Sequence, residues 1–232
     1  MNKNRLVITE DGSHTLFVAD LNEHYHSVHG AVAESKHVFI EAGLKPMLSK
    51  KKQISVLEIG LGTGLNAALA LLEAENNNVQ LIYTGIEPKP IDTEVVNQLN
   101  YFSIDGGERM REAIMSIHHG ERSHAFSIGK HFVMNYLEAR IQDIRFDNET
   151  FDLVFFDAFS PTSQPELWTI DVFRKIFSAI QPNGFLVTYV AKGEVRRTMK
   201  ACGFEIEKLP GFAGKREMTR AHKPLITIPL TI

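Results

Sequence analysis

The stretch from Val56 to Asn66 constrains the fold of this chain more than any other. It reads Val-Leu-Glu-Ile-Gly-Leu-Gly-Thr-Gly-Leu-Asn: an unbroken run typical of a buried strand, three alternate glycines, and the start of an Ala/Leu-rich segment. The pattern predicts a strand, a tight loop and a helix, whose free N–H groups would face a ligand. The alternative is a tight turn in an α/β domain that binds no nucleotide. The glycines are Gly60, Gly62 and Gly64.

The glycine spacing argues against a pyrophosphate-binding loop. The dinucleotide fingerprint Gly-x-Gly-x-x-Gly needs a small residue where this chain has Leu65. Glu58 precedes the loop, and Glu87 ends the next apolar run, where a carboxylate can accept both hydroxyls of a ribose. These features favour a nucleoside ligand without a bound diphosphate.

Composition sets the class of protein. The chain has 232 residues, of which 44% are hydrophobic and 23% charged, enough for one sizeable core. Cys202 is the only cysteine, which excludes an intramolecular disulfide and fits a reducing, cytoplasmic setting. No apolar run approaches the ~18 residues of a membrane span. His24 and His26 lack carboxylate or cysteine partners at ligand spacing, so we expect no metal.

Charge is unevenly placed along the chain. The formal net charge is −3, yet the stretch from Lys192 to Ile232 holds nine basic and four acidic residues. This asymmetry predicts a local patch that contacts phosphates; the alternative is a solvated helix face and strand edge.

The order of apolar runs predicts a single α/β fold. Residues Arg5–Ile8 and His14–Val18 alternate around Asp11-Gly12, a hairpin signal, and 31–44 has helical spacing. We therefore expect an N-terminal hairpin and helix extension over 1–45, packed on a core over 46–232. The core would hold a mostly parallel seven-stranded sheet with helices on both faces. Its further strands are expected at 81–87, 132–140, from 151, at 185–190 and 203–209, with a closing hairpin at 211–218 and 225–230; its helices at 65–74, 92–102, 108–118, 168–180 and 194–201.

A second informative site follows the strand that begins at Phe151. The segment Asp157-Ala-Phe-Ser-Pro161 turns from an apolar strand into an acidic, aromatic loop stopped by proline. In such sheets the carboxyl ends of the strands face the ligand crevice, so Asp157 should lie beside the ligand. Asp143 follows the strand at 132–140 in a similar way. The alternatives are a structural cap for Asp157 and a turn-forming role for Asp143.

These motifs together resemble class I S-adenosylmethionine-dependent methyltransferases, and in particular the methyltransferase domain of the MnmC family. MnmC finishes 5-methylaminomethyl-2-thiouridine at the tRNA wobble position. Its FAD-dependent oxidase domain has no counterpart here, so the resemblance implies a form without FAD and a separate FAD-dependent oxidase as a possible partner. The matching segments are His24–Ser27, Glu34–Phe39, Glu58–Asn66, Asp157–Pro161 with Trp168, and Gly211–Met218.

The resemblance implies methyl transfer from S-adenosylmethionine to the amine of 5-aminomethyl(-2-thio)uridine in tRNA. Asp157 would hold the amine and help receive its proton, with Ser160 or Tyr25 completing the position and Phe159 or Trp168 stacking the uracil. The cofactor would be bound by Glu58, Gly60, Gly62, Gly64, Asn66, Glu87, Asp143 and Asp157. Phosphates would be bound by Lys192, Arg196, Arg197, Lys215 and Arg216.

Two rival functions fit the same residues. Polyamine synthases are aminopropyl-transferring relatives of this fold that also hold an amine with an aspartate loop, and methylation of another small amine is a variant of this alternative. The second rival is a module that binds an adenine nucleoside without turnover. The basic C-terminal segment favours RNA over the first, and turnover on tRNA would exclude the second.

Overall fold

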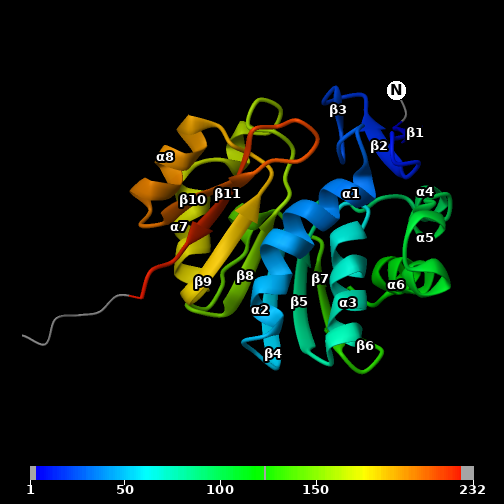
Figure 1. Cartoon of the computed structure of the whole chain (residues 1–232), viewed down its shortest axis with the longest axis horizontal. Coiled ribbons are helices and arrows are strands. Elements are labelled where there is room, and N and C mark those ends of the chain that lie inside the picture. Colours follow the sequence, from blue (N-terminus) through cyan, green and yellow to red (C-terminus); the bar gives the residue numbers. More distant parts are fainter. Residues whose placement is uncertain (1–3, 123, 226–232) are drawn as a thin grey trace, which may run out of the picture.

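The computed structural model describes residues 4–122 and 124–225, which form an eight-stranded sheet and a small three-stranded sheet (Figure 1). The large sheet has the order β10-β11-β9-β8-β4-β5-β7-β6. Its strands are β4 (Gln53–Ile59), β5 (Gln80–Ile86), β6 (Phe126–Ile128), β7 (Phe132–Leu137), β8 (Phe151–Phe156), β9 (Ile180–Thr188), β10 (Glu205–Pro210) and β11 (Glu217–His222).

The centre of this sheet is parallel and its edges are antiparallel. Strands β9, β8, β4, β5 and β7 run parallel, whereas β6, β11 and β10 pair antiparallel. The predicted class of fold is confirmed, but the sheet has eight strands instead of seven. The additional strand is β6, a three-residue strand beside β7 that is too short to produce a recognisable alternation.

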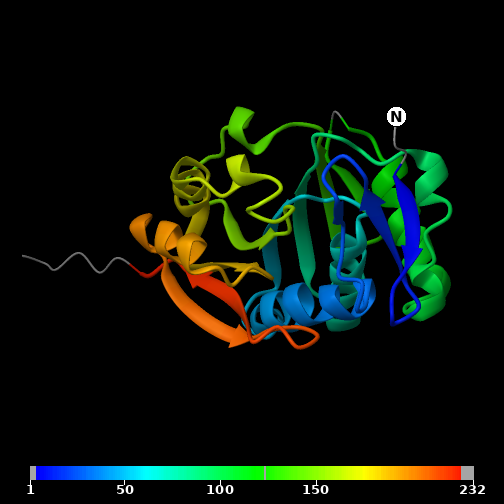
Figure 2. The ribbon, with the colours of Figure 1, turned by 90° about the horizontal axis from the view of Figure 1, so that it is seen from above.

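Helices cover both faces of the large sheet (Figures 1 and 2). One face packs against the joined helix α1 (Ala31–Ser35), η1 (Lys36–Leu44) and α2 (Lys45–Leu48), and against α3 (Leu65–Asn77) and α6 (Gly107–His119). The other face packs against α7 (Ile170–Ala179) and α8 (Gly193–Ala201). Along β4 the side chains alternate between these faces: Val56 packs on the α3 side, and Leu57 and Ile59 pack on the α7 side.

The joined helix runs into the core as one continuous element with a π-helical middle, η1. Val38, Phe39 and Leu44 are buried in it, and Gly43 lies so close to the sheet that a Cβ there would meet the Phe155 ring at 2.9 Å. The helix thus shares its core with the residues after 45. The proposed division of the chain near residue 45 stays a prediction.

The N-terminal sheet is attached to the core by polar side chains. It consists of β1 (Arg5–Ile8), β2 (His14–Val18) and β3 (Glu23–His24); the β1–β2 hairpin was predicted and the two-residue β3 was not. Asp11 in the hairpin accepts hydrogen bonds from Thr9, Ser13 and the backbone N–H of Ala33, at the start of α1. The hairpin is therefore connected directly to the first helix.

Two predicted segments differ from the structure. The predicted helix at 92–102 is two short helices, α4 (Thr93–Val96) and α5 (Tyr101–Ile104). It breaks at Asn100, whose side chain accepts from the N–H of His14 and donates to the carbonyl of Gly12. The closing hairpin is formed by β10 and β11, so 211–216 is its connection; the predicted strand at 225–230 lies, after its first residue, outside the described residues.

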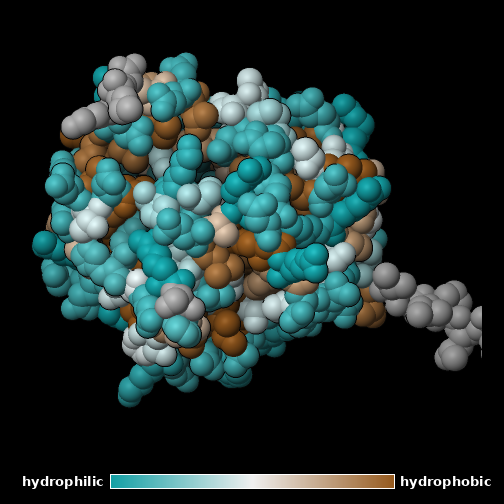
Figure 3. Space-filling view, turned by 180° about the vertical axis from the view of Figure 1, so that it is seen from behind, coloured by the Kyte–Doolittle hydropathy of each residue, from teal (hydrophilic) through white to brown (hydrophobic). Residues whose placement is uncertain are grey.

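The surface of the described residues is mostly hydrophilic on the face opposite to that of Figure 1 (Figure 3). Among the helices of the described residues, none has both the length and the apolar character needed to cross a membrane.

Candidate active site

Strand alternation brings three polar side chains to the α3 side of the sheet. Glu58 lies two residues after Val56 on β4, Tyr83 faces the same way on the neighbouring β5, and Asp157 follows Phe155 at the end of β8. The N–H of Asp157 donates to the carbonyl of Ile59 at 2.9 Å, which extends the β4–β8 ladder by one residue. The two acids and the phenol thus come from three adjacent strands and lie under the start of α3.

Asn66, in the first turn of α3, joins the two acids. Its Nδ2 donates to Glu58 Oε1 at 2.8 Å and to Asp157 Oδ2 at 2.8 Å. The phenol of Tyr83 donates to the second oxygen of Glu58, Oε2, at 2.7 Å. Glu58 is fully buried and Asn66 is 2% exposed. Within the described chain, Asn66 Oδ1 is buried without a hydrogen-bond partner.

Burial changes the acid–base character of both carboxyl groups. Desolvation raises the pKa of Glu58 well above its usual range, although the bonds from Tyr83 and Asn66 oppose this shift. Desolvation also raises the pKa of Asp157, to about 8; the bond from Asn66 and the charge of Lys215 lower it, and the charge of Glu34 raises it. Asp157 therefore exchanges a proton near neutral pH.

The glycine loop passes closely between Asp157 and an aromatic ring. A Cβ at Gly60 would lie 2.4 Å from the carbonyl oxygen of Asp157. Gly62 has φ +50°, and a Cβ there would lie 2.8 Å from the ring of Tyr25. At the far end of the loop, His118 Nε2 donates to the carbonyl of Thr63 at 2.9 Å, so α6 fixes the loop from behind. Only glycine fits the two positions without moving a neighbour.

Glu87 lies beyond the end of β5 with only 8% of its surface exposed. Its Oε2 accepts the N–H of Gly62 at 3.1 Å and its Oε1 accepts the N–H of Lys89 at 3.0 Å. Burial raises the pKa of this carboxyl, and the two backbone donors oppose the shift. Each oxygen has room for one more donor, as a pair of ribose hydroxyls would supply.

These groups surround a cavity of about 250 Å³ at the carboxyl ends of β4, β5 and β8. The Asp157 end of the cavity is aromatic. The rings of Tyr25 and Phe159 meet edge to face with centroids 5.1 Å apart. The phenol of Tyr189 donates to the carbonyl of Ala158 at 3.0 Å. The Glu87 end is lined by Pro88, Lys89, Arg140, Ile141 and Gln142. The cavity thus joins a nucleoside-type end to a carboxylate held among aromatic rings.

Ser160, Trp168 and Asp143 are among the predicted residues that do not line this cavity. Ser160 donates to Glu23 Oε1 at 2.7 Å, as does Ser163, so its hydroxyl connects its loop to β3. Trp168 is 6% exposed, packs on Phe156 with centroids 4.7 Å apart, and donates to the carbonyl of Phe159 at 2.9 Å. Its buried ring supports the loop and does not present a face for stacking. Asp143 is exposed, and its neighbour Gln142 lines the cavity instead.

The basic residues predicted to bind phosphate fall into two groups. Arg196 is 8% exposed and binds Thr219, Glu217 and the carbonyl of Met218, which makes it a structural residue. Because α8 turns Arg196 toward β11, its guanidinium is used within the fold, and its predicted contact with phosphate stays a prediction. The exposed members are Lys192, Arg197, Lys215 and Arg216.

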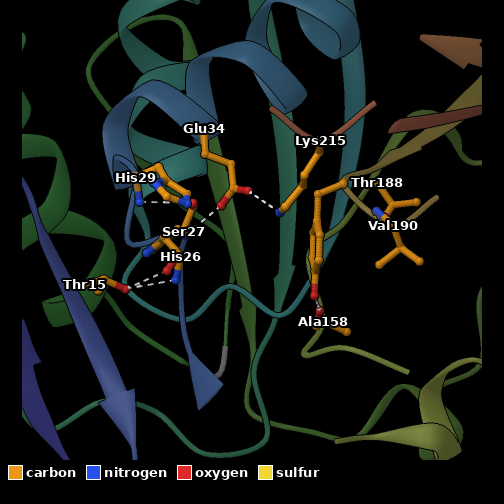
Figure 4. A network of polar contacts seen from close by, with 10 residues as sticks. Thr15, His26, Ser27, His29, Glu34, Ala158, Thr188, Val190 and Lys215 are labelled. Atoms are coloured by element: carbon orange, nitrogen blue, oxygen red, sulfur yellow. Dashed lines mark hydrogen bonds and ion pairs between the residues drawn. The ribbon is translucent and has the colours of Figure 1, made fainter. Parts of the chain in front are cut away.

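Lys215 connects the β10–β11 loop to the N-terminal helix (Figure 4). Its Nζ lies 3.1 Å from Glu34 Oε1 and 5.0 Å from the centre of the Tyr189 ring. Glu34 Oε2 accepts the N–H of Ser27 at 2.8 Å, which holds the segment next to Tyr25. Segments from both ends of the chain thus meet beside the cavity.

Several cavity residues were not singled out from the sequence. Tyr189 follows β9 and could have been found by the rule that found Asp157, since both stand at carboxyl ends of parallel strands. Lys89 and Arg140 lie in loops and Gln142 in a three-residue 3-10 helix, Ile141–Asp143, where no periodicity marks a residue as facing inward.

The fold combines a parallel sheet with a glycine loop after β4 and a buried carboxylate, Glu87, after β5. These features define a nucleoside-binding α/β fold. The glycine cradle, the acceptor oxygens of Glu87 and the unpartnered Oδ1 of Asn66 fit a cofactor that carries a ribose and further N–H donors. The family model described as S-adenosyl-L-methionine-dependent methyltransferase matches residues 109–224. The chain belongs to this family.

Comparison with known proteins narrows the resemblance. The chain is 31% identical over 209 residues to the tRNA 5-methylaminomethyl-2-thiouridine biosynthesis bifunctional protein MnmC of Cupriavidus necator, covering 85% of this chain and 31% of that protein. It is 30% identical to MnmC of Ralstonia nicotianae, covering 90% and 33%. The chain therefore spans about a third of the length of these curated relatives.

Solved structures show the same resemblance. MnmC2 of Aquifex aeolicus superposes with a TM-score of 0.80 at 26% identity, covering 95% of this chain and 70% of that one. Spermidine synthase of Thermotoga maritima superposes with a TM-score of 0.54 at 14% identity, covering 96% and 70%, which is a likeness of fold. The predicted resemblance to MnmC is confirmed.

Proposed function

We propose that this protein transfers a methyl group from S-adenosylmethionine to the primary amine of 5-aminomethyl(-2-thio)uridine at the tRNA wobble position. The observation that carries the proposal is the carboxyl group of Asp157, which lies in the cavity beside the glycine loop. The names of the MnmC relatives supply the class of substrate. The cytoplasm, where tRNA is available, is the expected location.

The chemistry requires a neutral amine aimed at the methyl carbon. A new C–N bond forms as the C–S bond breaks, the sulfur keeps the electron pair of that bond, and the amine loses one proton. Asp157, with a pKa of about 8, is suited to accept this proton and to hold the amine by a hydrogen bond. Tyr25 and Phe159 enclose the position, where the uracil ring would pack after leaving the base stack.

The tRNA itself would be held by the exposed basic side chains near the cavity. Lys192 on the N-terminal side of α8 donates to Thr162 Oγ1 at 2.8 Å, and Lys215 approaches the cavity from the β10–β11 loop. With Arg197 and Arg216 they would contact phosphates. A separate FAD-dependent oxidase that generates the primary amine is the expected partner.

The direct test is incubation of the purified protein with methyl-labelled S-adenosylmethionine and tRNA that carries 5-aminomethyluridine. We expect label in one nucleoside, with the mass of 5-methylaminomethyluridine after digestion. A parallel reaction supplies decarboxylated S-adenosylmethionine and putrescine. Aminopropyl transfer in that reaction, without label in tRNA, would contradict the proposal, and cofactor binding without either product would indicate a binding module.

A further inference from the structure

The amide of Asn66 occupies the space between two acids on neighbouring strands. We propose that Asn66 is a positioning residue for Asp157: its Nδ2 engages Asp157 Oδ2 and leaves Oδ1 to meet the substrate amine, while Glu58 and Tyr83 fix the direction of the amide. The catalytic part of this inference rests on the proposed function. The contacts themselves do not.

The direction of the amide follows from its neighbours. Tyr83 donates to Glu58 Oε2, so Oε1 is the Glu58 oxygen left for a second donor, and Asn66 Nδ2 lies 2.8 Å from it. Nδ2 carries two hydrogens, and the second points at Asp157. A flipped amide would turn both Nδ2 hydrogens away from Glu58 and Asp157 and would break the two bonds. Glu58 therefore selects the orientation in which Asn66 donates to Asp157.

The bond from Asn66 fixes the carboxyl group of Asp157 and gives its two oxygens different partners. Oδ2 is engaged by a side chain that is 2% exposed and held at the start of α3. Rotation of the carboxyl group about Cβ–Cγ would break this bond. A proton or an amine is then directed to Oδ1, and the bond to Oδ2 favours the charged form of Asp157, which is the form that accepts a proton.

The first test measures the titration of the Asp157 carboxyl group in the ligand-free protein by carbon-13 NMR. Asn66→Ala should move this titration upward by about one pH unit, because the charged form loses its donor. Asn77→Ala, at the exposed end of the same helix, should leave it unchanged. Asn66→Ser, whose side chain is too short to join both acids, should shift the Asp157 titration in the same direction. This variant replaces the alanine variant in the test if the latter does not fold.

The second test asks whether Glu58 acts through Asn66. Other titratable groups also face Asp157: Glu34 from α1, Lys215 from the β10–β11 loop, and the phenols of Tyr83 on β5 and of Tyr189 just after β9. These are unchanged in a double-mutant cycle. The titration shift caused by Glu58→Gln should become smaller in the Asn66→Ala background. An equal shift in both backgrounds would show that Glu58 acts on Asp157 by charge alone and would overturn this part of the inference.

The third test is catalytic. In single turnovers at saturating cofactor, Asn66→Ala should move the pH–rate inflection upward and lower the rate at pH 7 roughly tenfold, since a smaller fraction of Asp157 is charged. A proportional loss of rate at every pH, with an unshifted carboxyl titration, would overturn the positioning role. If the wild-type protein methylates no tRNA but the titration shifts as expected, the proposed function fails and the Asn66–Asp157 coupling stands.

Discussion

Asp157 combines an accessible position with a poorly solvated carboxyl group. It stands at the end of β8, where the strand opens into the cavity, yet the glycine loop, Asn66 and Tyr189 surround it closely. The same burial that raises the pKa of Asp157 makes its charged form unfavourable for the folded protein. Activity and stability should therefore respond to this residue in opposite directions.

Replacement of Asp157 by asparagine should lower methyl transfer by roughly 10²–10⁴-fold, because the amine loses its proton acceptor. The affinity for S-adenosylmethionine should change little, since Glu87 and the glycine loop remain. Single-turnover rates and calorimetric titration with the cofactor check the two expectations. Full turnover in this variant would remove Asp157 from the mechanism.

The stability of the ligand-free protein should depend on pH through the same group. The folded-state pKa of Asp157, about 8, is above its unfolded value of 3.8, so the folded protein holds the extra proton between these values. Stability should fall as pH rises through this window. The melting temperature of Asp157→Asn relative to wild type should rise by at least about 4 °C from pH 5 to pH 8.5. A constant difference across this range would show that burial does not raise the pKa of Asp157.

At the scale of elements, the glycine loop leaves little room for an added side chain. Gly62→Ala should weaken cofactor binding and destabilise the fold, because a Cβ would press on the Tyr25 ring at a φ of +50°. Gly107 has nearly the same φ, +52°, with nothing within 4 Å of a Cβ. Gly107→Ala therefore isolates the backbone strain. Calorimetry and thermal melts should show loss of cofactor affinity in Gly62→Ala alone.

Helix α8 presents a matched pair of adjacent arginines. Arg197→Ala should weaken tRNA binding and reduce the slope of log affinity against log salt by about 1, because an exposed phosphate contact is lost. Arg196→Ala should instead lower the melting temperature, since Glu217 and the carbonyl of Met218 lose their partner. Filter binding at several salt concentrations and thermal melts separate the two. Equal salt slopes for wild type and Arg197→Ala would exclude Arg197 from the interface.

The sequence predicts the elements more completely than it predicts what their side chains do. Strand β4, the glycine loop, Glu87 and Asp157 could be found because alternation and strand order place them at one edge. The contacts of Arg196 and Trp168 could not be predicted, since the guanidinium bonds to Thr219 and the indole packs on Phe156, residues that only the fold brings next to them. The role of Asn66 as a bridge needed the register of β4 with β8.

At the scale of the whole molecule, the N-terminal sheet and the core behave as one unit. Asp11→Ala should destabilise the protein by about 1–3 kcal/mol, because the partly buried N–H groups of Ser13 and Ala33 lose their acceptor. It should also weaken cofactor binding, since the sheet carries the segment with Tyr25. Chemical denaturation and calorimetry measure both effects. Unchanged cofactor affinity in a measurably destabilised variant would show that Tyr25 keeps its place without the hairpin.

The attachment of that small sheet also restricts how molecules reach the cavity. Asp11 connects the hairpin to α1, and Asn100 connects it to the segment between α4 and α5. The small sheet next to Tyr25 is therefore fixed to the core at two points. The part of the cavity lined by Lys89 and Gln142 belongs to the core and not to the small sheet. We expect the used cofactor to leave past these residues while tRNA still covers the aromatic end, so that the small molecule exchanges without release of the large one.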